Sequence, residues 1–158
     1  TSFAASENII LGYHRDPAYN GLIEMDRDAI TKSCRDQMEH FDVRPGNPLL
    51  RVSLFSGGNQ QKMVVAREME RNTDLLVVGQ PTRGVDIGAI EFIHRQIIAM
   101  RDANKAVLLV SVELDEILSL SDRILVMFDG QIMGEVLAKD ANERDIGLLM
   151  AGIRKEAA

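Results

Sequence analysis

The chain contains one cysteine, no tryptophan and two tyrosines among 158 residues. A single thiol, Cys34, excludes an internal disulfide and a multi-cysteine metal site. Few aromatic side chains leave little surface for stacking on nucleic-acid bases. The net charge of −6 does not suit a broad contact with phosphates. We therefore expect no nucleic-acid partner and no metal site built from the chain's own side chains.

Long apolar runs are also missing. No run approaches the ~18 residues that indicate a membrane span, and the N-terminus shows no secretory signal. The composition is 46% apolar and 27% charged, a balance typical of globular proteins. These features predict one soluble domain of ordinary size.

The hydrophobic pattern changes near residue 55. Before it the pattern is mainly helical, with a short helix expected at 6–11 and a longer one from an N-cap at Asp26 to about His40. The longer helix carries apolar residues at helical spacing, among which Cys34 is expected to be buried: Ile30, Cys34, Met38 and Phe41.

After residue 55, short apolar runs alternate with helical segments. The wholly apolar run at 75–78 predicts a strand buried on both faces. Asp129-Gly130 predicts a hairpin. This alternation of strands and helices predicts an α/β fold with a parallel sheet and an antiparallel hairpin. Strands are expected at 75–78, 106–112, 123–128 and 131–136, and helices at about 59–71, 88–102, 113–120 and from 142 onward.

Residues 55–62, with the sequence FSGGNQQK, form the first stretch that carries chemistry. Ser56, Gly57 and Gly58 precede a predicted helix. They present a hydroxyl and unobstructed backbone N–H groups at the positive end of the helix dipole, which suits a phosphate. The same three residues also suit an ordinary N-cap followed by a glycine turn. This stretch alone leaves both interpretations open.

Residues 74–86, with the sequence DLLVVGQPTRGVD, form the second stretch. A buried strand followed by Pro-Thr-x-Gly is expected where the C-terminal edge of a sheet faces a ligand. Together the two stretches resemble the Leu-Ser-Gly-Gly-Gln signature and the Walker B and D-loop run, Asp-Glu-Pro-Thr-x-Gly-x-Asp, of ABC-transporter ATPases. Ser56 and Gln80 lie 24 positions apart, the separation that the family has between signature serine and catalytic glutamate. The resemblance continues through the H-loop strand and closing hairpin and covers about residues 6–150.

The resemblance implies a partial P-loop NTPase core together with a helical subdomain. Residues 1–53 would be the N-terminal part of the helical signature subdomain, 54–72 the signature helix, and 73–158 the C-terminal part of the RecA-like core. The endings Asn-Gln-Gln-Lys and Thr-Arg-Gly-Val-Asp look like the second ATPase domain of importers for simple sugars and nucleosides, which carry two ATPase domains on one chain.

The phosphate-binding loop, Gly-x-x-x-x-Gly-Lys-Ser/Thr, is absent, and the chain contains no Gly-Lys pair. The family places this loop upstream of position 1, so we expect a fragment that does not hydrolyse ATP by itself. Gly79 replaces the Walker B aspartate, Gln80 the catalytic glutamate and Val112 the H-loop histidine. A neutral amide can orient water but cannot accept its proton. The resemblance therefore implies a degenerate half-site.

The signature, by contrast, is intact at its serine and both glycines. The resemblance implies that the signature grips ATP, bound with Mg²⁺ by the partner ATPase domain, and that Asp86 contacts that domain. The residues expected to bind ATP in this way are Ser56, Gly57, Gly58, Asn59 and Gln60. Further implied partners are membrane permease subunits and, indirectly, a solute-binding protein, at the cytoplasmic face of the membrane. Because the strand of the phosphate loop is missing, we also expect the fragment to self-associate.

Two alternatives stay open. The first is a non-catalytic dimerisation or regulatory module derived from an ABC ATPase, which the three losses favour and the intact signature opposes. The second is a soluble ABC ATPase acting on ribosomes or DNA ends. Such proteins keep a working Walker B motif and carry basic or coiled-coil insertions, which this sequence lacks.

Overall fold

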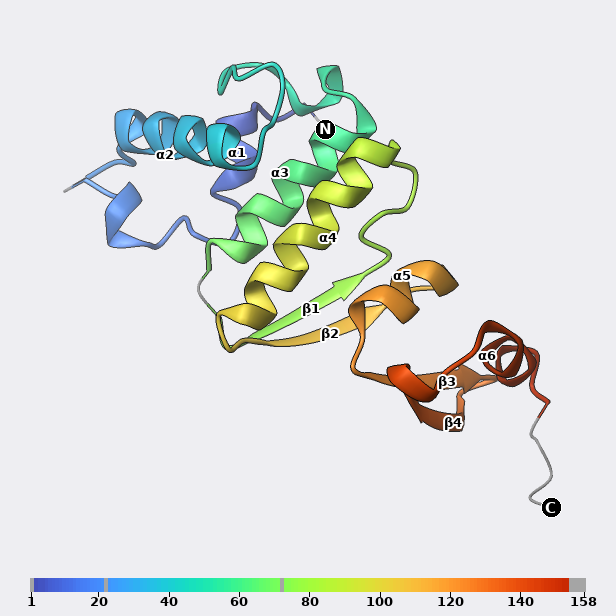
Figure 1. The fold of residues 1–158 in the computed structure, drawn as a ribbon. Helices are drawn as coiled ribbons and strands as arrows, with labels where there is room; N and C mark the ends of the chain where they lie inside the picture. Colours follow the sequence, from blue (N-terminus) through green and yellow to red (C-terminus); the bar gives the residue numbers. More distant parts are fainter. Residues whose placement is uncertain (1, 22, 72, 154–158) are drawn as a thin grey trace. The chain divides into compact units, whose positions relative to one another are not determined.

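A computed structural model describes residues 2–21, 23–71 and 73–153. Three short 3₁₀ turns, Pro17–Tyr19, Val52–Leu54 and Ala138–Asp140, were not predicted from the sequence. Among the described residues, no helix combines the length and the apolar character needed to cross a bilayer. The helices and strands (Figure 1) are α1 (Ala5–Ile9), α2 (Arg27–His40), α3 (Gly57–Met69), β1 (Leu75–Gly79), α4 (Ile87–Asp102), β2 (Ala106–Val110), α5 (Leu114–Leu120), β3 (Arg123–Phe128), β4 (Gln131–Leu137) and α6 (Glu143–Met150).

The chain divides into two compact units. One comprises residues up to 76 together with 81–107, and the other comprises 77–80 together with the residues from 108 onward. β1 and β2 form one two-stranded sheet, and β3 and β4 form another. The backbone N–H of Ala106 donates to the carbonyl of Asp74, and that of Gln80 to the carbonyl of Val110, both at 2.8 Å. Residue numbers thus rise together along both strands, so β1 and β2 are parallel. The predicted α/β class, with a parallel sheet and an antiparallel hairpin, is confirmed.

Helix α2 forms where the sequence predicts it. The Asp26 carboxylate accepts from the backbone N–H groups of Asp28 and Ala29 and so caps the helix. Ile30, Cys34 and Met38 recur every four residues and are buried along one stripe. Burial raises the pKa of the Cys34 thiol from 9.0 to about 12. The predicted core position of this cysteine is confirmed.

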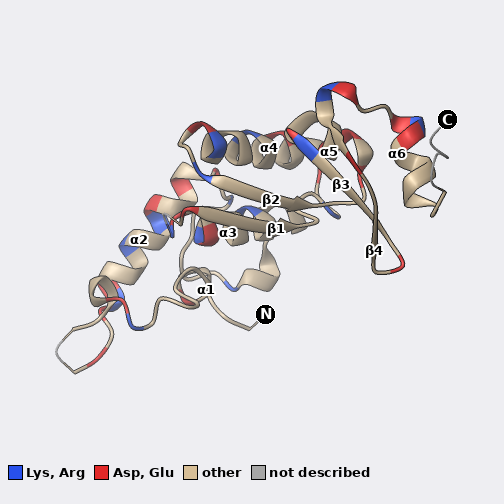
Figure 2. Ribbon diagram, turned by 90° about the horizontal axis from the view of Figure 1, so that it is seen from below, with Lys and Arg blue, Asp and Glu red and all other residues tan. Residues whose placement is uncertain are grey.

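The prediction that strand 75–78 is buried on both faces is wrong. Leu76 is buried, but Leu75 and Val77 are 53% and 61% exposed. Successive side chains of a strand point to opposite faces, and the described residues cover only one face of β1. Neither β1 nor β2 contains a charged residue, and both strands are tan in Figure 2.

The second unit builds its core on the hairpin. Asp129 and Gly130 have φ of 46° and 73°, the pair of positive values that a type I′ two-residue turn between antiparallel strands requires. The predicted hairpin at Asp129-Gly130 is confirmed, with Phe128 opposite Gln131. Ile124, Val126 and Ile146 are buried together, and partly buried side chains of α5 and α6 pack against them.

Helices α3 and α4 belong to the first unit and lie side by side (Figure 1). Met63 and Ala66 of α3 are buried, as are Ala89, Ile93 and Ile97 of α4. Burial of these apolar stripes fixes the first turn of α3 relative to the first turn of α4. That arrangement brings Gly58 of the first motif next to Asp86 of the second, both within the first unit.

Candidate functional site

The signature residues form the start of α3. Ser56 is the N-cap, and the helix begins at Gly57, two positions earlier than predicted. Ser56 and Gly57 are exposed, whereas Gly58 is buried. The first N–H groups of a helix have no partner within the helix and carry its positive partial charge. This 13-residue helix therefore presents an anion-attracting end at the surface of its unit.

Gly58 is packed against the D-loop residue Asp86. A Cβ atom at Gly58 would lie 2.8 Å from Asp86 Oδ2 and 3.2 Å from the Cβ of Ala89. Asp86 Oδ1 accepts a hydrogen bond of 2.9 Å from the Ala89 backbone N–H, which caps α4. A Cβ at Gly57 would meet only the Gly84 carbonyl oxygen, at 3.4 Å. The signature and the D-loop thus fit together closely at Gly58, and the contact of Asp86 with a partner domain stays a prediction.

Asn59 connects the signature to a loop that precedes it in the chain. Its Nδ2 donates to Ser56 Oγ at 2.9 Å, and its backbone N–H lies 3.4 Å from the same oxygen. Its Oδ1 accepts from the Arg44 backbone N–H at 2.7 Å. Gln60 turns back instead and donates from Nε2 to the Phe55 carbonyl oxygen at 2.9 Å. The roles of Asn59 and Gln60 in ATP binding stay predictions.

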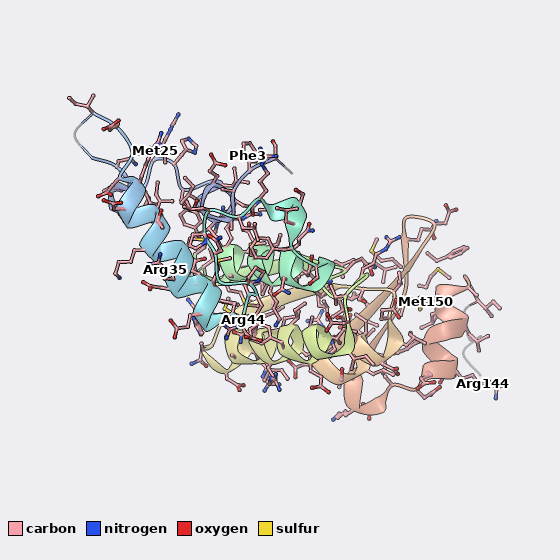
Figure 3. All side chains as sticks on the ribbon, turned by 90° about the horizontal axis from the view of Figure 1, so that it is seen from above. Phe3, Met25, Arg35, Arg44, Arg144 and Met150 are labelled. Carbon is pink, nitrogen blue, oxygen red and sulfur yellow. The ribbon has the colours of Figure 1, made fainter. Side chains whose placement is uncertain are left out.

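The loop contacting Asn59 follows α2 and includes Arg44, which is labelled in Figure 3. Lys62, on α3, donates from Nζ to the carbonyl oxygen and to Oδ2 of Asp42, at 3.0 and 3.2 Å. The hydrogen bonds from Lys62 and then from Arg44 hold the pKa of the Asp42 carboxyl below its usual value. Residues 45–48 were expected to form a loop, but the sequence did not predict its contact with the signature, because 15 positions separate Arg44 from Asn59 and no motif marks the contact.

The Walker B-like residues lie in the second unit, at the end of β1. Gln80 has a φ of 50° and donates its backbone N–H to Val110, the last residue of β2. Positive φ in a residue other than glycine is costly and occurs preferentially at functional sites. Val112 follows β2 instead of lying within the predicted strand 106–112, and it is 61% exposed. The structure thus brings Gln80 close in space to the end of the H-loop strand.

This half-site does not fit a magnesium ion. Mg²⁺ prefers carboxylate and water oxygens, and Gly79, Gln80 and Val112 supply no carboxylate. Apart from its chain neighbours, no atom of the described residues lies within 4 Å of the position that a Gly79 Cβ would occupy, so a side chain would have room there. None of these three side chains therefore offers a cation a carboxylate ligand, and the degeneracy of this half-site stays a prediction.

Two pockets lie in the first unit, and all their lining residues except Glu70 precede α3. The larger, of about 560 Å³, includes Tyr13, Tyr19 and Gln37 in its lining, and the smaller, of about 490 Å³, includes Glu24 and Ile30. Neither pocket is lined by a residue of the signature or of the D-loop.

Comparisons with known proteins identify relatives of the chain and proteins of the same fold. No protein-family model matches the chain. The nucleoside import ATP-binding protein NupA of Lactococcus lactis is 49% identical over 147 residues, which cover 93% of this chain and 29% of that protein. The guanosine import ATP-binding protein NupO of Bacillus subtilis is 46% identical over 157 residues, covering 99% of this chain and 31% of that protein. The chain thus spans about a third of the length of these curated relatives.

Solved structures confirm the fold. A bacterial ABC transporter cassette solved as a dimer superposes with a TM-score of 0.71 at 22% identity, covering 86% of this chain and 57% of the cassette. A nucleotide-free ATP-binding cassette gives a TM-score of 0.70, also at 22% identity, covering 95% of this chain and 60% of that one. The chain therefore has the fold of ABC ATPase cassettes, and its homologues are the ATP-binding proteins of ABC importers for nucleosides and sugars.

Proposed function

We propose that this chain is the C-terminal part of the second ATPase domain in an importer's ATP-binding protein, and that its signature completes an ATP site held by the partner ATPase domain. The exposed start of α3 carries the proposal. Ser56 and Gly57 lie at the polarised end of a long helix, in the unit that contains Asp86. Such an end suits the γ-phosphate of a nucleotide bound elsewhere.

The chain's own half-site is proposed to be degenerate. Phosphoryl transfer depends on positioning and on neutralising charge. Gly79 and Val112 offer no polar side chain, and the Gln80 amide accepts no proton at physiological pH. The assembly would therefore hold one competent site, completed by this signature, and one that hydrolyses ATP poorly. The phosphate-binding loop of the degenerate site would come from residues upstream of this chain.

The proposed partners follow from the relatives' names. NupA and NupO are import ATP-binding proteins for nucleosides and guanosine. We expect this chain to act with the first ATPase domain of the same protein, with permease subunits at the cytoplasmic face of the membrane and, indirectly, with a solute-binding protein. The imported solute would be a nucleoside or a simple sugar, and the proposed cofactors are ATP and Mg²⁺ in the partner's site.

The test is Ser56→Ala, with Ser53→Ala as its matched control, in the full-length protein assembled with its permease. Ser53 is an exposed serine three positions earlier, outside the signature. We expect Ser56→Ala and Gly57→Asp to lower the ATPase and transport rates, and Ser53→Ala to leave both unchanged. Wild-type rates in both signature variants would refute the proposal.

The alternative is a non-catalytic dimerisation module, favoured by the three losses in the half-site. In that case Ser56→Ala would leave ATP turnover unchanged, while removal of the whole chain would abolish dimer formation. For the isolated chain we propose self-association, because Leu75, Val77, Leu108 and Val110 are each at least half exposed on the two parallel strands. Sedimentation over a range of concentrations tests this, and a strictly monomeric chain would contradict it.

A further inference from the structure

We propose that Asn59 is a positioning residue that turns the Ser56 hydroxyl into a dedicated hydrogen-bond donor toward an anionic oxygen. The inference rests on the proposed function, because it concerns how the signature meets a nucleotide phosphate. Its basis is the direction of three consecutive hydrogen bonds that connect Arg44, Asn59 and Ser56.

The direction of these bonds is fixed at one end by the backbone. The Arg44 N–H can only donate, so the atom of Asn59 that meets it at 2.7 Å is the carbonyl oxygen Oδ1. The opposite end of the amide, Nδ2, therefore faces Ser56 Oγ at 2.9 Å. An amide nitrogen can only donate, so Ser56 Oγ accepts this bond. The orientation of the amide follows from chemistry and needs no hydrogen positions.

The hydroxyl of Ser56 is left with one unused hydrogen-bonding capacity, its O–H donor. A serine oxygen has two lone pairs and one proton. One lone pair accepts from Asn59 Nδ2, and the second faces the Asn59 backbone N–H at 3.4 Å. In the described part of the chain, no acceptor takes the proton of this exposed hydroxyl. The O–H is thus the remaining capacity of the group, and an anionic oxygen is the partner that suits it.

The loop that orients Asn59 is held by the same helix. Lys62 lies one turn after Asn59 on α3 and binds both the carbonyl oxygen and the carboxylate of Asp42. Its side chain is only 13% exposed, and its Nζ also lies 4.9 Å from the centre of the Phe92 ring. The Asp42 carboxylate accepts in addition from Arg44 Nε at 3.1 Å. Two residues of α3 thus contact this loop: Lys62 binds Asp42, and Asn59 accepts from the Arg44 N–H that orients its amide.

Asn59→Asp tests the direction of the hydrogen bond from Asn59 Nδ2 to Ser56 Oγ. An aspartate keeps the size of the side chain and still accepts from the Arg44 N–H, but it cannot donate to Ser56. The Ser56 hydroxyl would then donate to the new carboxylate and would no longer be available to a phosphate oxygen. Asn59→Ala removes the contact without adding a charge. Each variant is made in the wild type and in Ser56→Ala, giving a double-mutant cycle that isolates the part acting through Ser56.

The measurements are the ATPase kcat and KM of the assembled full-length protein, and the dissociation constant of a non-hydrolysable ATP analogue, which needs no turnover. We expect Asn59→Ala to weaken binding of the analogue and to lower kcat/KM about tenfold, the change produced by one lost contact of ~1.4 kcal/mol. In the Ser56→Ala background the same substitution should change either quantity less than about twofold. Asn59→Asp should also weaken binding and lower kcat/KM through Ser56. If the new carboxylate also repels the phosphate directly, that part of its effect will persist in the Ser56→Ala background.

The outcomes separate the inference from the proposed function. If Ser56→Ala lowers both quantities and neither Asn59 variant does, the inference is refuted and the proposed function stands. If the loss from Asn59→Ala is equally large with and without the Ser56 hydroxyl, Asn59 serves only the structure, which also refutes it. If Ser56→Ala has no effect, the proposed function fails and the inference fails with it. Thermal unfolding of each variant identifies any that does not fold, and Asn59→Asp then replaces Asn59→Ala in the cycle.

Discussion

Replacing Gly58 by alanine should destabilise the first unit, whereas the same replacement at Gly57 should not. The new methyl at Gly58 would lie 2.8 Å from Asp86 Oδ2 and 3.2 Å from the Cβ of Ala89. Carbon and oxygen atoms do not approach to 2.8 Å without a shift, so the carboxylate that caps α4 must move. At Gly57 the nearest atom is the Gly84 carbonyl oxygen at 3.4 Å, an ordinary contact.

The magnitude follows from three terms. Loss of an N-cap hydrogen bond costs about 1 kcal/mol, and crowding in a packed contact costs about 1–3 kcal/mol. Alanine gains up to about 1 kcal/mol over glycine within a helix. The balance for Gly58→Ala is a loss of about 1–4 kcal/mol of unfolding free energy. For Gly57→Ala the first two terms are absent, so the change lies between about zero and a 1 kcal/mol gain.

The assay is urea denaturation of both variants, with hydrogen exchange at the Ala89 amide as the local measurement. We expect a lower midpoint for Gly58→Ala with an unchanged m value, and faster exchange at Ala89, whose N–H donates to Asp86. Adding Asp86→Ser, a shorter N-cap, should recover part of the loss. Equal midpoints for Gly58→Ala and Gly57→Ala would refute the close fit between the signature and the D-loop.

Three further predictions concern other parts of the chain. Because burial raises the pKa of Cys34 from 9.0 to about 12, the folded state binds the thiol proton more tightly than the unfolded state. This contribution to stability is complete below pH 9 and declines as the pH rises toward 12. An alkylating reagent at pH 8 should modify Cys34 only in denaturant, and fast modification without denaturant would contradict its burial. The lowered pKa of Asp42 has the opposite sign: its contribution is present above the usual value of 3.8 and is lost as the pH falls through the lowered pKa. Asp42→Asn should therefore reduce stability at pH 7 and have no effect at the acid end of a pH series of urea denaturations, while equal stability of the two proteins at pH 7 would argue against the contact with Lys62. Gln80→Glu should raise ATP hydrolysis little in the assembled protein, because Gly79 still supplies no carboxylate, and a large gain would show that the half-site is not degenerate.

The sequence determined most of the elements. Asp26 caps α2 as expected, because an N-cap aspartate accepts hydrogen bonds from backbone N–H groups only two and three residues further along the chain. Asp129-Gly130 made its turn for the same local reason. The signature and Walker B-like runs were also recognisable, because their residues are consecutive and their spacing is fixed. The predicted subdomain boundaries at 53/54 and 72/73 stay predictions.

Only the tertiary structure decided which faces are buried and which distant residues contact the signature. The burial of one face of β1 depends on what packs there, and an apolar run such as 75–78 carries the same letters whether one face is covered or two. The contact of Gly58 with Asp86 joins residues 28 positions apart, and the bond from Arg44 to Asn59 joins a loop to a helix. Hydrogen-bond direction and close packing depend on positions in space, which spacing along the chain does not specify. The sequence therefore predicted the signature motif, and the fold brought Arg44 to Asn59 and Asp86 to Gly58.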